Sequence, residues 1–451
     1  MFQRVLIANR GEIAVRIIRA CRELGIETVA IYSQADEDSL HARLADQAFC
    51  VGPAPSSGSY LNIPNIISTA VLAEVDAIHP GYGYLSEQAH FAEICHTHGI
   101  KFIGPPVAAI EKMGDKAAAR RMMQEAGLPV IPGSEPVQSE EEALAAAEEI
   151  GYPIMLKAAS GGGGKGMRVV EDAQALRRVF ASAQAEAEAS FGDRRLYLEK
   201  FIRSPRHVEI QILADEHGNI IHLGERECSL QRRHQKVLEE APSPVVDEDL
   251  RRRMGEAAVA GARAVGYTNA GTMEFLLDAD GNFYFMEMNT RIQVEHPVTE
   301  MITGIDLVQE QILIAAGYPL RWRQEDITWN GHAIECRINA EDPARGFLPS
   351  PGTIDFYHMP GGPGLRIDSM AFSGCVVSPY YDSMIAKVIC HAPTREQALQ
   401  KMRAALSEVI ISGIHTNVAF HQALLDDERV QRGEVSTDFI DRAIQEGSLR
   451  L

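Results

Sequence analysis

The sequence predicts a mixed α/β and α+β protein with about three domains, and three observations support this fold class. The chain has 451 residues, of which 45% are hydrophobic, so it can bury large cores. It begins with a strand–helix–strand pattern that is typical of a parallel sheet. Farther along, two pairs of strand-like runs flank glycine-containing turns, which favours antiparallel hairpins.

The predicted elements fall into an N-terminal α/β domain, a linker, a glycine-rich lid and a catalytic and C-terminal region. These segments are residues 1–112, 113–132, 133–201 and 202–451. The helices are predicted from the helical spacing of apolar residues and from glycine or proline at their ends. The expected strands are 5–8, 28–32, 77–79, 153–158 and 167–170, and the expected helices are 13–24, 107–126, 139–150 and 306–316.

The glycine run between Ser160 and Met167 predicts a flap that closes over a bound group. Four consecutive glycines cost backbone entropy, so we expect a ligand to approach their backbone closely. The GxGxxG spacing is a weak signal, because a strand follows it instead of a helix, and the phosphate loop GxxxxGK[ST] is broken at Met167. A flap over a nucleotide triphosphate fits best. A flexible solvent loop is the alternative.

A second hairpin is predicted around Asp280 and Gly281, a pair that is typical of a two-residue type I′ turn. Counting outward from that turn places Glu274 directly opposite Glu287. Residues paired in this way have Cβ atoms about 4.5–5.5 Å apart, and two like charges at that distance are destabilising. We therefore expect a divalent cation between the two carboxylates.

Beyond the hairpin, the residues of one parity are acids, amides and an arginine, namely Glu287, Asn289, Arg291, Gln293 and Glu295. In an extended strand these side chains lie on one face. Oxygen ligands of this type suit Mg²⁺ or Mn²⁺ shared with substrate phosphates. A solvent-exposed strand would alternate in the same way, and this is the alternative.

Basic residues are concentrated at a few positions of a chain whose net charge is −19. One cluster spans Gln231–Lys236, and Lys116 and Lys157 lie beside the linker and the flap. Lys157 ends the strand that enters the flap, so we expect it to point toward the covered group. For Arg232 and Arg233 a solvated surface is an equal alternative. The overall acidity argues against a nucleic acid or an anionic membrane as partner.

The cysteines and the apolar runs predict a cytoplasmic protein. The seven cysteines are scattered and form no CxxC pair, which is typical of a reducing compartment. No segment reaches the roughly eighteen apolar residues of a membrane span, and the start of the chain leaves no room for a signal peptide.

Over essentially all 451 residues the chain resembles biotin carboxylases, which are ATP-grasp ligases. The motifs that carry the resemblance are 79–87, 113–116, the glycine run, 206–209, 231–236, 287–297 and 335–342. The resemblance implies an ATP-grasp fold with an N-terminal parallel α/β domain, a mobile glycine-flap lid and a C-terminal antiparallel-sheet domain.

The resemblance also implies a role for individual residues. The residues implied to bind ATP are Lys116, Lys157, Gly163, Gly164, Lys165, Gly166, Met167, Glu199, Lys200, Ile202, His207, Gln231, His234 and Leu276. The implied metal ligands are Glu274, Glu287 and Asn289. The implied bicarbonate and biotin pocket contains Lys236, Arg291, Gln293, Val294, Glu295, Tyr82 and Arg337. Among these, the implied catalytic residues are Glu295 as the base, Arg337 beside the biotin enolate, Lys236 and Arg291.

By the same resemblance, bicarbonate attacks the γ-phosphate of ATP with the help of two Mg²⁺ or Mn²⁺ ions, and the carboxyphosphate that forms supplies the carboxyl group of N-carboxybiotin. The chain contains no Met-Lys-Met, so we expect the biotin to arrive on a separate carrier protein, with carboxyltransferase subunits completing the assembly. Acetyl-CoA carboxylase is the expected assembly, and another acyl-CoA, pyruvate or 2-oxoacid carboxylase is the alternative. A homodimer is expected, although Pro363 stands where some relatives place an aromatic dimer contact.

Three other functions are alternatives to this one. Another ATP-grasp ligase would share the flap, the lysines and the metal acids but not the series Arg291, Gln293 and Glu295. A dinucleotide-binding oxidoreductase would need more glycines than Gly11 in the first turn. An inactive ATP-binding regulator would not need Glu295 and Arg337.

Overall fold

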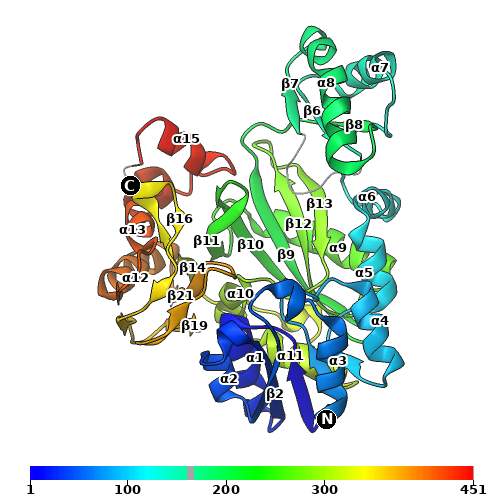
Figure 1. Ribbon diagram of the computed structural model, residues 1–451. Helices are drawn as coiled ribbons and strands as arrows, with labels where there is room; N and C mark the ends of the chain where they lie inside the picture. The colour runs from blue at the N-terminus through cyan, green and yellow to red at the C-terminus, as the bar shows by residue number, and fades with distance from the viewer. Residues whose placement is uncertain (160–166, 450–451) are drawn as a thin grey trace.

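The computed structural model describes residues 1–159 and 167–449, and its larger sheets form three regions. Figure 1 shows the N-terminal domain, in blue, at one end of the molecule and the lid projecting at the opposite end. Long central strands lie between them, and the C-terminal helices, in orange and red, lie beside the central region. The predicted mixture of α/β and α+β architecture is confirmed.

The N-terminal domain is a parallel sheet with helices packed against it. Its strands are β1 (Arg4–Ile7), β2 (Glu27–Ser33), β3 (Gln47–Gly52), β4 (Ala77–His79) and β5 (Lys101–Phe102), and its helices are α1 (Gly11–Glu23), α2 (Leu40–Leu44), α3 (Ile63–Leu72) and α4 (Ala89–Thr97). The strand order is β3-β2-β1-β4-β5. Strand β1 is apolar throughout its buried part because both faces of a parallel sheet are covered. The predicted strands and first helix are confirmed.

The single helix predicted over residues 107–126 is wrong. The structure has two helices, α5 (Val107–Gly114) and α6 (Lys116–Glu125), which are separated by Asp115 in an extended conformation. The Asp115 carboxylate accepts a hydrogen bond from the Ala118 backbone N–H at 2.9 Å, so it caps α6. Aspartate favours this N-cap role over a position inside a helix. The break places Lys116 at the first residue of α6.

The lid is a small unit with its own hydrophobic core. It contains α7 (Glu140–Ile150), β6 (Ile154–Ala158), β7 (Arg168–Val170), α8 (Ala173–Phe191) and β8 (Leu196–Lys200). The strands form an antiparallel sheet in the order β7-β6-β8. The predicted strands on both sides of the glycine run are thereby confirmed. The run itself, residues 160–166, lies outside the described residues.

The central sheet has eight antiparallel strands and continues into the C-terminal region. Its strands are β9 (Arg206–Ala214), β10 (Ile220–Arg232), β11 (Gln235–Ala241), β12 (Asn269–Leu277), β13 (Phe283–Asn289), β14 (His332–Asn339), β19 (Leu365–Ser369) and β21 (Met384–Ala392). The order is β13-β12-β9-β10-β11-β14-β21-β19. The sheet therefore joins residues of the predicted metal hairpin to residues of the C-terminal region.

Helices and short strands surround this sheet. The helices are α9 (Glu248–Val265), α10 (His296–Thr303), α11 (Leu307–Ala315), α12 (Arg395–Glu408), α13 (Val418–Asp426), α14 (Glu428–Gln431) and α15 (Phe439–Gln445). The short strands are β15 (Glu341–Asp342), β16 (Leu348–Pro349), β17 (Gly352–Thr353), β18 (Phe356–His358), β20 (Val376–Val377) and β22 (Ile410–Ser412). Helix α11 confirms the prediction for 306–316, and the Asp306 carboxylate caps it by accepting from the Gln309 N–H.

The hairpin between β12 and β13 is confirmed, but its predicted two-residue turn is wrong. The Asp278 N–H donates to the Asn282 carbonyl at 2.9 Å, which leaves a three-residue loop at 279–281 with Gly281 at φ 80°. The Asp278 carboxylate accepts from the Asn282 N–H, an interaction that favours such loops. A register shift between Glu274 and Phe275 then restores the predicted pairing of Glu274 with Glu287.

Within residues 1–159 and 167–449, no helix is long and apolar enough to cross a membrane. All seven cysteines have free thiols, and six of them are buried.

Candidate active site

Glu295 is a fully buried carboxylate at the N-cap of α10. Its Oε1 accepts a hydrogen bond from Lys236 Nζ at 2.6 Å, and its Oε2 accepts one from Arg337 Nη2 at 2.8 Å. Burial alone would raise the pKa of Glu295, but the two cations outweigh it and hold this pKa well below its usual range. The structure therefore presents an ionised carboxylate between two cations from the adjacent strands β11 and β14.

Lys236 connects this base to the predicted metal residues. Its ammonium group lies 2.6 Å from Glu209 Oε2 and 3.0 Å from Glu274 Oε1, in addition to its contact with Glu295. Burial opposes the charge on Lys236, but the three carboxylates raise the pKa of this lysine well above its usual value. Lys236 thus remains a cation in the middle of three anions.

Glu274 and Glu287 face each other as the hairpin prediction required, and each already has a cationic neighbour. Glu274 Oε1 accepts from Lys236 Nζ, and its Oε2 lies 3.2 Å from His207 Nε2. Glu287 Oε2 accepts from Lys116 Nζ at 3.0 Å. Burial opposes ionisation of Glu274, yet Lys236 and His207 hold the pKa of this carboxyl well below its usual range. Glu274 is therefore available as an anionic ligand.

The residues around this pair fit a divalent cation. The two carboxylates are the kind of oxygen ligand that Mg²⁺ and Mn²⁺ bind together with phosphate oxygens, and the Asn289 side chain lies beside them, donating from Nδ2 to Glu274 Oε1 at 2.9 Å. A cavity adjoins them and is lined in part by Lys116, Glu287 and Asn289. The cavity gives a polyphosphate access to the hairpin.

A neighbouring group of possible metal ligands is blocked by a lysine. Side-chain atoms of His207, Glu209 and Glu274 lie within 4.8 Å of one another and could surround an ion. The Lys236 ammonium, however, bonds both carboxylates of this group. The positive charge at that position is therefore supplied by the protein itself.

The predicted alternation from Glu287 to Glu295 holds only in part. Strand β13 ends at Asn289, so residues 290–295 are not extended strand as expected. The side chains nevertheless converge, because the Arg291 guanidinium donates to Asn289 Oδ1 at 3.0 Å and to Gln293 Oε1 at 2.9 Å. Hydrogen bonds between side chains, rather than strand alternation, keep this series together.

The backbone of Val294 and the side chain of Tyr82 are linked through one buried lysine. Lys387 Nζ donates to the Val294 carbonyl at 2.8 Å and lies 3.2 Å from Glu12 Oε1. The Tyr82 hydroxyl donates to the same Glu12 oxygen. The predicted pocket therefore combines residues of the N-terminal domain with residues of the central sheet.

The predicted nucleotide residues lie in the lid and on nearby strands. Lys157 on β6 forms an ion pair with Glu199 on β8, and Lys200 Nζ donates to the Gly151 and Tyr152 carbonyls. His207 pairs with Leu276 across β9 and β12. Its Nδ1 lies 2.7 Å from Gln231 Nε2. Ile202 is half-buried just after β8, and Met167 is half-buried just before β7. Gly163, Gly164, Lys165 and Gly166 lie outside the described residues.

The basic cluster at 231–236 forms the tip of the β10–β11 hairpin. Arg232 pairs with Gln235, and the two residues between them, Arg233 and His234, have φ values of 50° and 63°. A type I′ turn requires two such positive φ values, which cost energy in residues other than glycine. The tip is therefore a strained segment of backbone next to the Lys236 side chain.

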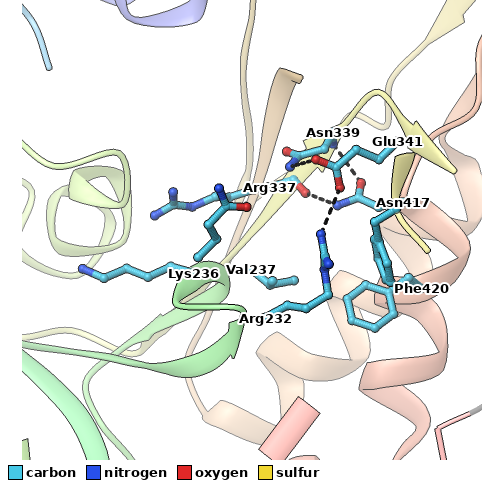
Figure 2. A pocket seen from close by; sticks show the side chains of 10 residues that line it. Arg232, Lys236, Val237, Arg337, Asn339, Glu341, Asn417 and Phe420 are labelled. Atoms are coloured by element: carbon cyan, nitrogen blue, oxygen red, sulfur yellow. Dashed lines mark hydrogen bonds and ion pairs between the residues drawn. The ribbon is translucent and has the colours of Figure 1, made fainter. Parts of the chain in front are cut away.

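A smaller cavity lies on the other side of Lys236 and Arg337. Figure 2 shows the charged ends of Lys236 and Arg337 pointing away from Asn417 and Phe420. Arg232 stacks on the Phe347 ring with its guanidinium carbon 3.9 Å from the ring centroid. The cavity therefore lies behind the catalytic candidates.

Four charged residues around the site have no role in the sequence analysis. Glu209 and Glu239 are fully buried partners of Lys236 and Arg337, and the buried Arg226 donates to Glu209 Oε1 at 2.6 Å. Glu87 accepts from Arg291 Nε at 3.0 Å although it comes from the N-terminal domain. The period-two spacing of His207 and Glu209 was the available signal for Glu209. No local pattern links Glu87 to Arg291, because 204 positions separate them.

Comparison with protein families agrees with this geometry. Residues 1–110 match the biotin carboxylase N-terminal domain, residues 115–323 match the carbamoyl-phosphate synthase L chain ATP-binding domain, and residues 335–442 match the biotin carboxylase C-terminal domain. Biotin carboxylase 1 of Bacillus subtilis is 57% identical over 443 residues, which cover 98% of each chain.

The chain belongs to the biotin carboxylase family. As a biotin carboxylase it is an ATP-dependent ligase with an ATP-grasp fold, so these predictions are confirmed.

Solved structures of biotin carboxylases have the same fold. The biotin carboxylase domain dimer of Hydrogenobacter thermophilus 2-oxoglutarate carboxylase, in complex with MgADP, ADP and bicarbonate, is 50% identical with a TM-score of 0.92. The match covers 99% of this chain and 98% of that one. The Campylobacter jejuni biotin carboxylase in a β,γ-ATP complex is 50% identical with a TM-score of 0.93. It covers 98% of this chain and 99% of its own.

Proposed function

We propose that this chain transfers the carboxyl group of bicarbonate to biotin at the expense of ATP, with Glu295 as the general base. The single observation that carries this proposal is the fully buried carboxylate of Glu295 held between Lys236 and Arg337. An acid in this position is ionised and is surrounded by groups that bind anions. Bicarbonate and a developing enolate are the anions that the reaction requires.

The ATP end of the site is assigned to the lid and to the β12–β13 hairpin. Lys116, Lys157 and residues 163–167 would hold the phosphates, and Glu199, Lys200, Ile202 and Leu276 would surround the adenine. His207, Gln231 and His234 would lie near the ribose and phosphates. Glu274, Glu287 and Asn289 would hold Mg²⁺ or Mn²⁺, and such ions neutralise the charge on the transferring phosphoryl group.

The bicarbonate step is assigned to Glu295 and its neighbours. Arg291, Gln293, Lys236 and the Val294 backbone would bind bicarbonate beside the base. Glu295 takes the proton of bicarbonate, whose oxygen then attacks the γ-phosphate to give carboxyphosphate and ADP. The lid would exclude water, because the mixed anhydride hydrolyses easily.

The biotin step is assigned to Arg337 with Tyr82 at the mouth of the pocket. Carboxyphosphate breaks into CO₂ and phosphate, and the phosphate can take the ureido proton of biotin. The guanidinium of Arg337 then faces the oxyanion of the biotin enolate, which attacks CO₂. Loss of one such donor typically costs about 10² to 10³ in kcat.

We further propose that the biotin is carried by a separate carrier protein and that carboxyltransferase subunits use the N-carboxybiotin. We also propose a cytoplasmic location and a homodimer, since the similar Hydrogenobacter domain is described as a dimer. Acetyl-CoA is the proposed acceptor, with another acyl-CoA, pyruvate or a 2-oxoacid as alternatives. Copurification of the native partners would identify the acceptor.

The test is carboxylation of free biotin with ATP, Mg²⁺ and labelled bicarbonate. We expect labelled, acid-labile carboxybiotin, together with ADP release that depends on bicarbonate and increases with biotin. ADP release that depends on an amino acid instead would contradict the proposal and favour another ATP-grasp ligase. Binding of NADH, followed by its fluorescence, would favour the oxidoreductase.

A further inference from the structure

Two buried glutamates face each other behind Arg337. Glu239 on β11 is the register partner of Glu335 on β14, and both side chains are fully buried. Cβ atoms of directly opposed residues lie about 4.5–5.5 Å apart in antiparallel strands. Two negative charges in that position repel each other strongly in a poorly hydrated interior.

Three of the four oxygens in this pair receive no hydrogen bond from the described residues. Glu239 Oε1 accepts from Arg337 Nε at 2.6 Å, but Glu239 Oε2 and both oxygens of Glu335 have no donor. A buried carboxylate without donors is costly, whereas a protonated carboxyl group supplies its own donor. The missing donor can therefore be a proton on the pair itself.

The nearby cations do not fill this place. Lys387 pairs with Arg337 across β14 and β21, yet its ammonium group bonds the Val294 carbonyl and Glu12. Arg337 divides its donors between Glu239 and Glu295. No ion pair within 4.0 Å joins Glu335 to a cation of the described residues. The charged groups that act on it most strongly are Lys387, Glu239, Arg337 and Glu295.

The same surroundings favour the protonated form of Glu335. Burial raises the pKa of Glu335 well above its usual value, and Glu239 adds to this effect while Lys387 opposes it. Burial also raises the pKa of Glu239 to about 7, although Arg337 opposes the shift. Glu335 is therefore the member of the pair that protonates first.

We propose that Glu239 and Glu335 form a buried binding site for one proton, which Glu335 carries and donates toward Glu239 Oε2. The shared proton allows Glu239 to stay ionised and to hold Arg337 in place. Glu335 and Glu239 are thus positioning residues. The part of this inference that concerns Arg337 rests on the proposed function, but the proton site itself does not.

Infrared spectroscopy of the full-length chain tests the proton site without any assay of activity. We expect the C=O band of a protonated carboxyl group at about pH 7 in the unchanged protein and its loss in Glu335→Gln. Glu240→Gln is the matched control. The Glu240 carboxylate follows Glu239 in the sequence but is ion-paired with Arg395 and His332, so this variant should keep the band. A protein without the band, or a band that survives in Glu335→Gln, would overturn the proposal.

Thermal unfolding gives a second measurement with a definite sign. A carboxyl whose pKa is raised by folding loses its contribution to stability as the pH rises through the folded pKa. The amide in Glu335→Gln cannot ionise, so its unfolding midpoint relative to the unchanged protein should rise as the pH increases above about 4.5, the ordinary pKa of the carboxyl group. If Glu335 is instead ionised in the folded protein throughout this range, the difference in midpoint should stay constant as the pH rises. Carbon-13 titration of labelled glutamate in the unchanged protein covers the case in which the variant does not fold.

Glu239→Gln separates positioning of Arg337 from a merely structural role. Its amide removes the anion that orients Arg337, so we expect biotin-dependent turnover to fall by about 10-fold to 100-fold. Bicarbonate-dependent ATP hydrolysis without biotin, which does not use the enolate contact, should fall much less. An equal loss of both activities would show a structural role. A protein with the infrared band but no carboxylation would refute the proposed function alone.

Discussion

Two pairs of facing glutamates in the same sheet have nearly the same backbone arrangement and opposite surroundings. Glu274 and Glu287 pair on β12 and β13, and their carboxylates are bonded by Lys236 and Lys116. The pair on β11 and β14 has one cation, Arg337, and three oxygens without a donor among the described residues. Facing carboxylates are thus compatible with different sources of positive charge. The first pair suits a metal ion with phosphates, and the second suits a proton.

A third pair of register partners, Glu227 on β10 and Glu240 on β11, supports this comparison. Glu240 is bonded by Arg395 at 2.7 Å and by His332 at 2.6 Å. Burial opposes ionisation, but these partners lower the pKa of Glu240 to about 2. Here the protein neutralises the charge with its own cation and no ligand is needed.

The largest effect is expected from the residue that connects the two main pairs. Glu295 contacts both Lys236 and Arg337, so Glu295→Gln removes the base but keeps its shape. We expect the bicarbonate-dependent rate to fall by a factor of about 10² to 10⁴, while the affinity for ATP remains unchanged. Steady-state kinetics with a separate ATP-binding measurement checks this. Unchanged turnover would remove Glu295 from the mechanism.

The next effect concerns the metal pair. Glu287→Gln and Glu274→Gln each remove one of the two proposed anionic ligands, so the Mg²⁺ concentration for half-maximal rate should rise by about 10-fold to 100-fold. A titration of rate against Mg²⁺ measures this. Glu216→Gln is the control, since this exposed side chain bonds Lys101 far from the hairpin, and its Mg²⁺ dependence should match that of the unchanged protein. Normal Mg²⁺ dependence in both hairpin variants would contradict the assignment.

The third effect is a loss of stability when Glu240, whose charge Arg395 and His332 neutralise, is replaced. Glu240→Gln leaves the half-buried Arg395 without its anion, so the free energy of unfolding should fall by about 3 kcal/mol at neutral pH. Because folding lowers the pKa of Glu240, its contribution is present above about pH 4.5 and disappears as the pH falls toward about 2. The difference in unfolding midpoint between variant and unchanged protein should therefore shrink on acidification. A difference that grows in acid would have the wrong sign.

The smallest effect concerns the loop that sets the register of the metal pair. Gly281 has φ 80°, a conformation that costs residues with a Cβ about 1 kcal/mol. Gly281→Ala should lower the free energy of unfolding by about that amount and leave the Mg²⁺ dependence unchanged. Chemical denaturation measures the first quantity. No loss of stability would argue against the three-residue loop.

Local patterns predicted the elements and the facing pair because they depend on neighbours in the sequence. The pairing of Glu274 with Glu287 was correct although the turn was wrong, since the register shift after Glu274 compensated for the longer loop. The break at Asp115 was missed because the apolar spacing continues across it. A capping aspartate inside a helical pattern was the only available signal.

The buried charges were harder to predict because their partners come from distant strands. Glu239 and Glu335 become neighbours only through the register of β11 and β14, and Arg291 meets Glu87 across two domains. The type I′ turn at Arg233 and His234 contains no glycine, so the sequence has no signal that predicts it. These contacts result from tertiary packing, which cannot be predicted from the local patterns of a single sequence.

The most direct test of the central claim is to locate the divalent ion. A crystal structure with Mn²⁺ and a non-hydrolysable ATP analogue, read from the anomalous signal of manganese, shows where the ion binds. We expect manganese between Glu274 and Glu287, with phosphate oxygens completing its coordination. Manganese bound elsewhere, with both carboxylates still on Lys236 and Lys116, would contradict this expectation.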